Sequence, residues 1–328
     1  MKINQLISIL FLFLASNLSA QVFELNPSDY FSFEPVFRHD YIVKNKIRSV
    51  RAAIVYKRDN EPIEDKGLTK SWEYDEDGFL TRYYYTSIHG FVNKVVAHPA
   101  VMRRGRKISG AYTTEEPVYS YDTVSTAYFY NPKKQIILRR TRDGDYYSSI
   151  YYEYDAQGNI RKQQVFRETN ASENKNTFKL GVQNLLSTEE FTYEKRSPRQ
   201  TKRKHLNDEG KVYKETILNY DSVGHLLDEN SSYTVSWMRS STKMTYDSKG
   251  KMILKSYTSN ENGDELTKSE YKYTASNMVD IENRFKGDIR YYEFNYLYDK
   301  QTNMLTSHFV REELNKAIVI VKYSYLYY

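Results

Sequence analysis

The sequence predicts an all-β protein built from repeated antiparallel hairpins, and three observations support this fold class. Segment 152–160 alternates aromatic and polar residues, as a pleated strand does, and then passes through a turn into a new strand. The same pattern returns at 72–80, 220–226 and 246–252. Tyrosine, a strand former, contributes 33 of the 328 residues. The chain is therefore expected to repeat one supersecondary unit.

Composition limits how such a chain can be stabilised. It has 48 Lys and Arg against 42 Asp and Glu, which gives a net charge of +6, and it has no Cys. Mean hydropathy is -0.74, so much of the sheet surface should face water. Neither disulfides nor a thiolate metal site can stabilise this chain. Its length permits one or two domains.

Residues 1–20 are predicted to be a secretory signal peptide. Lys2 precedes a short apolar run at 6–14, and the segment ends at the small residue Ala20. A membrane anchor is the alternative, but the run is too short to span a bilayer and no later stretch is long and apolar enough for a transmembrane helix. We therefore expect an exported protein in the periplasm, at the cell surface or outside the cell.

The mature chain is expected to begin with an irregular segment, 21–48, followed by a repeat domain at 49–328. Segment 47–56 is the first clear strand. The irregular segment is rich in large apolar side chains, which should pack onto one end of a sheet: Phe23, Leu25, Tyr30, Phe31, Phe33, Phe37 and Tyr41.

The repeats follow one another at a regular spacing. A tyrosine ends a predicted strand at 130, 154, 193, 220, 246, 273 and 298. The one long interval, from 154 to 193, contains a polar insertion at 168–177. The last strands are predicted at 251–259, 264–273, 278–285, 289–298, 304–312 and 317–328. Short turns between them give a long twisted antiparallel meander, which can curl into an open shell or a partial barrel.

Segment 87–126 lacks the repeat motif where the spacing requires one. It is interpreted as a degenerate repeat or as a long loop, and long loops in compact folds often carry function.

The predicted sheet has two unequal faces. Tyr292, Phe294, Tyr296 and Tyr298 share one face of their strand, whereas the strand at 264–273 has charged residues on the other face. An exposed aromatic face suits the rings of sugars. The same side chains could instead form the core of a rolled sheet.

The motif Tyr-x-Tyr-Asp-x-x-Gly-x-hydrophobic resembles the YD repeat of RHS-type and teneurin-type secreted proteins. Tyr152, Tyr154, Asp155, Gly158 and Ile160 carry it best. The resemblance extends loosely over residues 70–328. It implies a β-sheet that spirals into a shell or tube in a secreted or surface-associated protein. Some relatives of that family enclose a toxin, but this chain ends in a strand and has few repeats.

Residue types that carry catalysis or bind metals form no recognised motif. Each Asp-x-x-Gly turn offers one or two carboxylates, which favours turn formation over a calcium loop. The six histidines include no i, i+4 metal pair, and no Gly-x-Ser-x-Gly motif is present. We therefore predict no catalytic residue, no metal and no cofactor.

Two basic runs, 103–107 and 195–204, indicate contact with polyanions. Export argues against nucleic acid, so an anionic surface polymer or lipid headgroups are the expected partners. Solvated loops without a partner are the alternative.

These observations predict a secreted, non-enzymatic cell-envelope protein that binds a glycan, an anionic surface polymer or another envelope protein. An outer-membrane β-barrel, or an enzyme with its site in the 87–126 loop, are the alternatives. The candidate ligand contacts are Tyr292, Phe294, Tyr296, Tyr298, Arg103, Arg104, Arg106, Lys202, Arg203 and Lys204.

Overall fold

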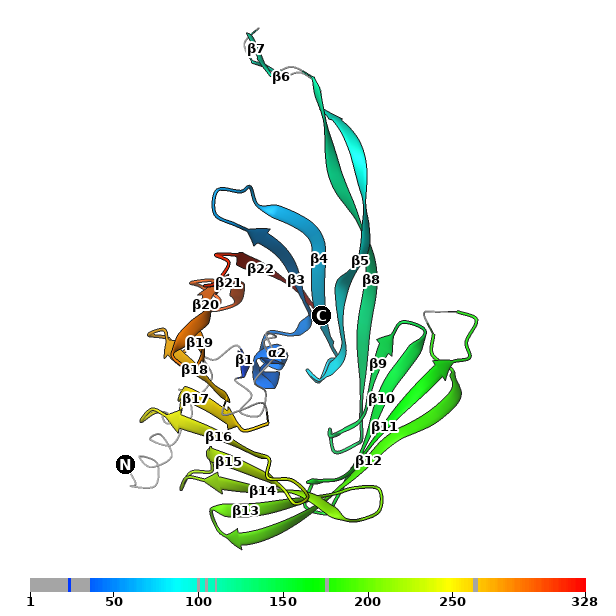
Figure 1. The fold of residues 1–328 in the computed structure, drawn as a ribbon, viewed down its shortest axis with the longest axis vertical. Coiled ribbons are helices and arrows are strands. Elements are labelled where there is room, and N and C mark those ends of the chain that lie inside the picture. Colours follow the sequence, from blue (N-terminus) through cyan, green and yellow to red (C-terminus); the bar gives the residue numbers. More distant parts are fainter. Residues whose placement is uncertain are drawn as a thin grey trace, which may run out of the picture.

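The protein is all-β, and its sheet closes into a single antiparallel barrel (Figure 1). The structure is a computed structural model that describes residues 23–24, 36–98, 101–103, 106–109, 111–174, 177–261 and 265–328. The predicted signal peptide at 1–20 lies outside the described residues. Closure goes beyond the open shell or partial barrel expected from sequence, and it confirms the antiparallel meander.

Each barrel strand pairs with its neighbours along the chain, and β22 pairs with β3 to close the ring. The barrel strands are β3 (Ile47–Lys57), β4 (Glu64–Tyr74), β5 (Leu80–His98), β8 (Tyr112–Tyr130), β9 (Ile136–Asp143), β10 (Tyr146–Tyr154), β11 (Ile160–Asn170), β12 (Leu180–Ser197), β13 (Gln200–Leu206), β14 (Val212–Tyr220), β15 (Leu226–Tyr233), β16 (Arg239–Tyr246), β17 (Met252–Ser259), β18 (Glu265–Tyr273), β19 (Val279–Lys286), β20 (Ile289–Tyr298), β21 (Leu305–Glu312) and β22 (Ile318–Tyr327). The last six strands confirm the predicted bounds to within one residue.

The Asp-x-x-Gly motifs form tight turns, as predicted. At 155–159 one carboxylate oxygen of Asp155 accepts hydrogen bonds from the backbone N–H groups of Gln157 (2.9 Å) and Asn159 (2.8 Å). Gly158 adopts φ 87°, a conformation that favours glycine. The Asn159 side chain also donates to Asp155, and together these bonds lower the pKa of the Asp155 carboxyl group. The repeat motif is thus a self-contained turn.

These turns gather at one end of the barrel, here named the tight-turn rim. Hairpins of an antiparallel meander alternate between the two ends, so the turns at 75, 131, 155, 221, 247, 274 and 299 share one rim. The opposite rim, named the long-loop rim, holds the connections after the other strands. The copy at Tyr193 is degenerate, because β12 continues past it to Ser197. An Asn207-based turn of the same type lies on the long-loop rim, where no copy was predicted.

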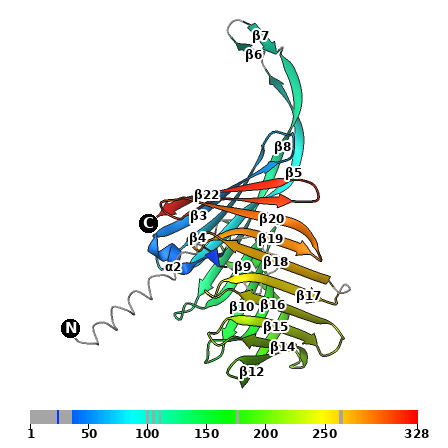
Figure 2. The same cartoon turned by 90° about the vertical axis from the view of Figure 1, so that its left-hand side faces the viewer.

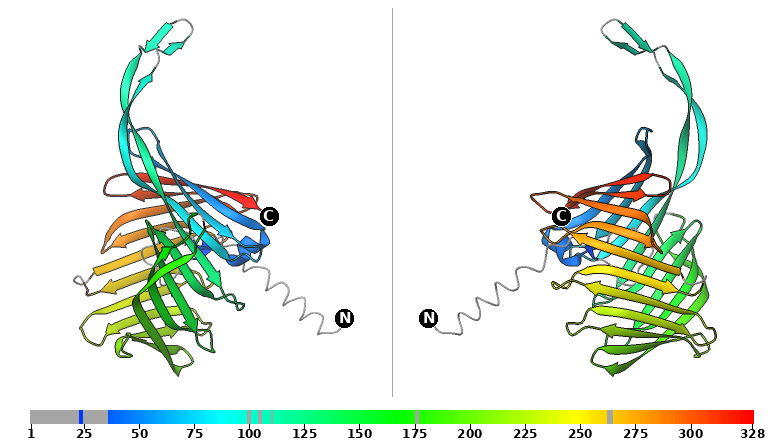
Figure 3. Two further views of the ribbon diagram at one scale, coloured as in Figure 1. Left: turned by 90° about the vertical axis from the view of Figure 1, so that its right-hand side faces the viewer. Right: turned by 60° about the vertical axis from the view of Figure 1, so that its left-hand side comes forward.

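Segment 87–126 is neither a compact repeat nor an irregular loop. Strands β5 and β8 have 19 residues each and pair from Arg82 and Ala127 out to His98 and Tyr112. Only their inner ends pair with β4 and β9, so the rest projects from the long-loop rim as a two-stranded ribbon (Figures 1 and 3). Two short strands, β6 (Val101–Arg103) and β7 (Arg106–Ser109), pair at its far end.

The N-terminal described residues lie inside the barrel, near the tight-turn rim (Figures 1 and 2). They form the strand pair β1 (Phe23–Glu24) and β2 (Val36–Phe37) and the short helix α2 (His39–Lys44). The Phe37 ring packs against Trp72 (5.4 Å) and Tyr323 (6.0 Å), and Ile42 is buried. The predicted packing of this segment onto the sheet is confirmed for Phe37 and Tyr41. No helix among the described residues is long and apolar enough to cross a membrane.

The contacts of Phe37 identify the inner face of the sheet, because strand side chains alternate between faces. Following the register from strand to strand places Phe294 and Tyr271 on the same inner face as Tyr323. Phe294 and Tyr296 are only 1% and 8% exposed. This burial corrects their assignment to a ligand surface: they belong to the barrel core, the alternative that the sequence left open.

Several strands carry charged side chains on the outer face of the barrel. In β18, Tyr271 points inward and is buried, so Lys268, Glu270 and Lys272 lie on the outer face. Charged outer residues also occur on β22 and β3, at Lys322 and Arg51. The core therefore lies inside the barrel.

Candidate functional site: a polar groove on the outer wall

The two remaining aromatic candidates are also tied into the sheet. Tyr298 donates its hydroxyl to the carbonyl oxygen of Val279 at 2.7 Å, and burial raises the pKa of its hydroxyl. Tyr292 is partly buried and packs against the core beside Phe294. The predicted aromatic ligand surface is therefore mostly core.

The predicted basic run on β13 is divided between the two faces of the sheet. Lys202 lies on the outer face and pairs with Glu215 at 2.6 Å. Arg203 lies on the inner face and pairs with Glu229 at 3.1 Å. Lys204 returns to the outer face, because side chains alternate along a strand. The run therefore forms no single cationic patch.

The other basic candidates lie at the far end of the ribbon. Arg103 and Arg106 are partners in the register of β6 and β7. Arg104 lies outside the described residues.

The inner wall holds a polar cluster that sequence reasoning missed. Glu189 accepts hydrogen bonds from His205 Nδ1 (2.6 Å) and from the Tyr213 hydroxyl. His205 Nε2 lies 3.2 Å from the Thr216 hydroxyl and accepts from the guanidinium of Arg203. Burial raises the pKa of Glu189, but the bonds from His205 and Tyr213 outweigh it and leave this pKa lowered.

An acid, a histidine and a hydroxyl in this order resemble a nucleophile relay. Thr216 is 0% exposed, however, and its hydroxyl is also 2.9 Å from Ser231. A substrate in solvent does not reach it. The cluster therefore stabilises the inner wall. Among the described residues, no group of three or more His, Asp or Glu side chains could hold a metal ion.

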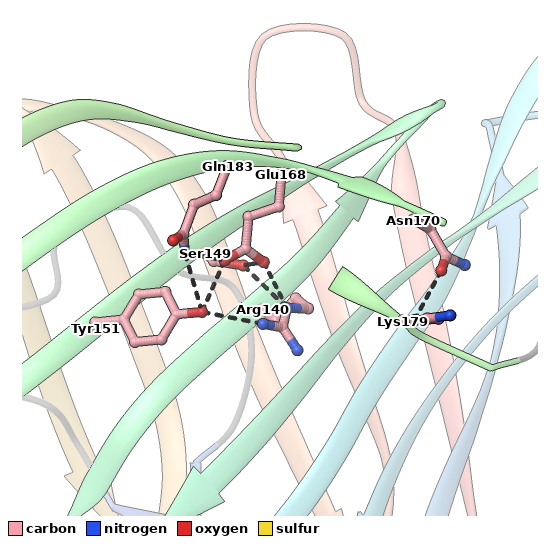
Figure 4. A network of polar contacts seen from close by, with 7 residues as sticks. All are labelled: Arg140, Ser149, Tyr151, Glu168, Asn170, Lys179 and Gln183. Carbon is pink, nitrogen blue, oxygen red and sulfur yellow. Dashed lines mark hydrogen bonds and ion pairs between the residues drawn. The ribbon is translucent and has the colours of Figure 1, made fainter. Parts of the chain in front are cut away.

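A second missed cluster centres on Glu168, which is fully buried on the outer face of β11 (Figure 4). Its carboxylate accepts from Arg140 (2.8 Å), Ser149 (2.6 Å), Tyr151 (2.7 Å) and Gln183 (2.8 Å). Burial raises the pKa of Glu168, but these donors outweigh it and hold this pKa below its usual value. Because every donor comes from another strand, the cluster fastens β9, β10, β11 and β12 together.

An open groove of about 740 Å³ lies over β14 to β18. Its floor follows one outer-face row of the register, in which Ile217 pairs with Asn230, Asn230 with Ser241, and Ser241 with Thr258. Leu266 completes the row as the partner of Thr258. The groove thus has an apolar residue at each end and hydroxyl and amide side chains between them.

The polar groups of the groove are held in fixed positions. The Ser241 hydroxyl donates to Asn230 Oδ1 at 2.7 Å. Asn260 anchors the loop between β15 and β16: its Oδ1 accepts from the Arg239 backbone N–H (2.7 Å), and its Nδ2 donates to the Trp237 carbonyl (3.1 Å). Trp237, in this loop, is 78% exposed. The loop that carries this exposed indole is thus bonded through its backbone to Asn260, which lines the groove.

Sequence reasoning missed this groove because serine, threonine and asparagine on strands give no motif. The signal available was the cluster of small polar residues at 230–232 and 240–242, together with one of only two tryptophans in a turn.

Comparison with known proteins gives only remote similarities. No family model and no curated protein matches the chain. Among solved structures, a porin-like protein from Bacteroides uniformis is 12% identical, with 86% of this chain and 97% of that chain covered and a TM-score of 0.36. A porin-like protein from Bacteroides vulgatus is 9% identical, with 63% and 94% covered and a TM-score of 0.28. The Tc holotoxin pore of Photorhabdus luminescens is 10% identical, with 81% and 21% covered and a TM-score of 0.19. At such TM-scores these similarities assign neither a fold family nor a function.

Proposed function

We propose that this protein is an exported, non-enzymatic barrel of the cell envelope that binds a glycan in the groove over β14 to β18. The observation that supports this proposal is the open groove of about 740 Å³, which adjoins the loop that carries the exposed Trp237. Envelope location follows from the predicted signal peptide.

The chemistry of the groove favours a sugar over a charged or an apolar ligand. Hydroxyl and amide groups such as those of Ser241, Thr258 and Asn230 both donate and accept hydrogen bonds, as sugar hydroxyls do. Trp237 offers a flat apolar face with a polar N–H edge, which suits a sugar ring. Two charged residues line the groove: Glu215, which is paired with Lys202, and Arg239, whose guanidinium can donate hydrogen bonds to sugar oxygens.

The intrinsic fluorescence of the protein allows a direct test. Trp72 is buried and Trp237 is exposed, so a sugar stacking on Trp237 should change the emission of that residue alone. We expect soluble oligosaccharides of peptidoglycan or outer-leaflet polysaccharide to shift the emission, with affinity measured by calorimetry. Trp237→Ala should weaken binding about tenfold or more, because a stacked aromatic ring contributes much of such an interface.

Leu314 is the matched control, because it is also 78% exposed on the long-loop rim but lies away from the groove. Leu314→Ala should leave the affinity unchanged. If none of these oligosaccharides binds, or if Trp237→Ala binds them as well as the wild type does, the proposal is wrong.

A second candidate, an outer-membrane barrel, is favoured by closure of the sheet. A closed antiparallel barrel with strands joined by turns to their neighbours is also the architecture of outer-membrane barrels. The outer wall argues against it, because a lipid-facing wall needs an apolar band on every strand and β18 has Lys268, Glu270 and Lys272 there. The enzyme alternative placed its active site in a loop at 87–126. That segment is instead a two-stranded ribbon, and most of its described side chains are exposed.

A further inference from the structure

The outer wall has a second depression where the two ends of the chain close the barrel. It has a volume of about 430 Å³ and lies over β22, β3, β4 and β5. One outer-face row of the register runs from Ser324 to Arg51, Ser71 and Tyr84, and the next runs from Lys322 to Ala53 and Thr69. Small residues form its floor, on which the long cationic side chains of Arg51 and Lys322 lie.

These two cations have no acidic partner in the part of the chain that the structure describes. Arg51 and Lys322 are both exposed, and the side chains next to them across the strands are small and uncharged. The acidic residue nearest in the register on this face is Glu73, which lies 4.0 Å from Arg82. The depression therefore carries an excess of positive charge.

A buried hydroxyl at the floor also lacks a partner. Ser71 is 1% exposed, and its Oγ makes no hydrogen bond to another described residue. Buried polar groups are normally hydrogen-bonded, so an unsatisfied one requires an explanation. The Ser71 hydroxyl sits directly beside Arg51 in the register and lines the depression.

We propose that this depression binds a tetrahedral oxyanion, such as the phosphate or sulfate group of an anionic envelope polymer. The planar guanidinium of Arg51 provides parallel N–H donors that match two oxygens of such a group, and Lys322 adds a point charge. The Ser71 hydroxyl, which lines the depression and has no partner among the described residues, is the donor for a third oxygen. This site lies on a different part of the wall from the sugar groove and does not depend on it.

The test uses the mature barrel and inorganic tripolyphosphate at low salt, with binding measured by calorimetry. Arg51→Ala and Lys322→Ala should each weaken binding about tenfold or more, because hydrogen bonds to charged groups are the strong ones. Ser71→Ala should weaken it about fivefold. Inorganic sulfate should compete with tripolyphosphate, whereas acetate, a planar carboxylate, should compete poorly.

Lys243→Ala is the matched control, because Lys243 is an exposed outer-face lysine on β16, far around the barrel wall. It should leave binding within about twofold of the wild type. If Lys243→Ala and Lys322→Ala lose the same affinity for tripolyphosphate, the attraction is diffuse and the proposed site is wrong. The proposed site is also wrong if tripolyphosphate does not bind. Trp237→Ala should bind tripolyphosphate normally, so failure of the sugar groove and failure of the oxyanion site are distinguishable.

Discussion

The hydroxyl of Tyr154, at the end of β10, donates a 2.7 Å hydrogen bond to the carbonyl oxygen of Ile136, the first residue of β9. Strands β9 and β10 are joined only at the long-loop rim, so at the tight-turn rim their ends have no covalent link. The same bond recurs between successive hairpins, from Tyr130 to Leu80, Tyr193 to Ile160, Tyr246 to Leu226, Tyr273 to Met252, Tyr298 to Val279 and Tyr325 to Leu305. At these seven positions the repeated tyrosine therefore fastens one hairpin to the one before it.

This relationship predicts a specific cost for losing the hydroxyl. Tyr154→Phe should lower the free energy of unfolding by about 1–2 kcal/mol, because the partly buried Ile136 carbonyl would lose its hydrogen bond. Urea unfolding followed by circular dichroism measures this change.

Tyr152 provides the control, because it lies two residues away on the same strand and no hydrogen bond of its hydroxyl to another described residue is seen. Tyr152→Phe should change stability by no more than about 0.5 kcal/mol. Equal effects of the two substitutions would contradict the fastening role of Tyr154.

The glycines of the tight turns give a second prediction. Gly158 and Gly250 have φ values of 87° and 77°, and a Cβ atom added at Gly250 would lie 2.9 Å from His225 Cε1. Replacing either glycine with Val should lower stability by about 1–3 kcal/mol, because a β-branched residue opposes positive φ. Thermal melting measures the loss.

Gly90, on β5, serves as the comparison for the glycine substitutions. A Cβ atom there would lie at an ordinary contact distance, 3.5 Å, from the Ser120 hydroxyl. Gly90→Val should therefore be tolerated. Unchanged melting of both turn variants would show that the turns do not need glycine.

The sequence was sufficient for features that depend on local chemistry. The turn at 155–159 could be predicted because Asp155 and Gly158 satisfy the backbone of one short segment. Strand bounds followed from the same turns. The resemblance of this motif to the YD repeat remains a prediction.

Features that join distant parts of the chain could not be predicted. Closure depends on β22 pairing with β3, from Ile318 and Lys57 to Tyr327 and Ile47, and no local pattern indicates that register. The burial of Phe294 and Tyr296 depends in turn on how the sheet curls. Glu168 gave no signal, because its donors Arg140 and Gln183 come from separate strands.

A third prediction concerns pH. His308 is buried between the rings of Tyr296 (5.6 Å) and Tyr323 (5.7 Å), and the Tyr323 hydroxyl is 2.9 Å from its Nδ1. Burial, with a smaller contribution from nearby Lys70, lowers the pKa of His308 from 6.5 to about 3. Between these two values the unfolded chain takes up a proton that the folded protein excludes. The free energy of unfolding should therefore fall as the pH falls through this window.

Between about pH 7.5 and pH 5 the loss should be about 2 kcal/mol, since one unit of pKa difference is worth about 1.4 kcal/mol. His308→Phe keeps an aromatic ring in the stack but cannot titrate, so it should show a pH dependence smaller by that amount. Urea unfolding at the two pH values tests this. If the wild type and the variant lose stability equally on acidification, His308 is not the group responsible.

The last prediction separates a water-soluble barrel from a membrane barrel. In a membrane barrel, apolar side chains face lipid and the interior is polar. Here Val50, Phe294 and Val321 form part of an apolar inner core, whereas Arg51 and Lys322 lie on the outer wall. A lysine on a lipid face costs about 2–4 kcal/mol at the bilayer midplane, and β18 alone would place two there.

We therefore expect residues 21–328, expressed without the signal peptide, to be soluble without detergent and to give a β-type circular dichroism spectrum. The folded protein should show a cooperative melting transition in water, because its apolar core is enclosed by its own sheet. Adding detergent micelles should neither be required for folding nor raise the melting temperature. Recovery of folded protein only from detergent-extracted outer membrane would instead place the barrel in lipid and remove the water-facing wall on which both proposed binding sites depend.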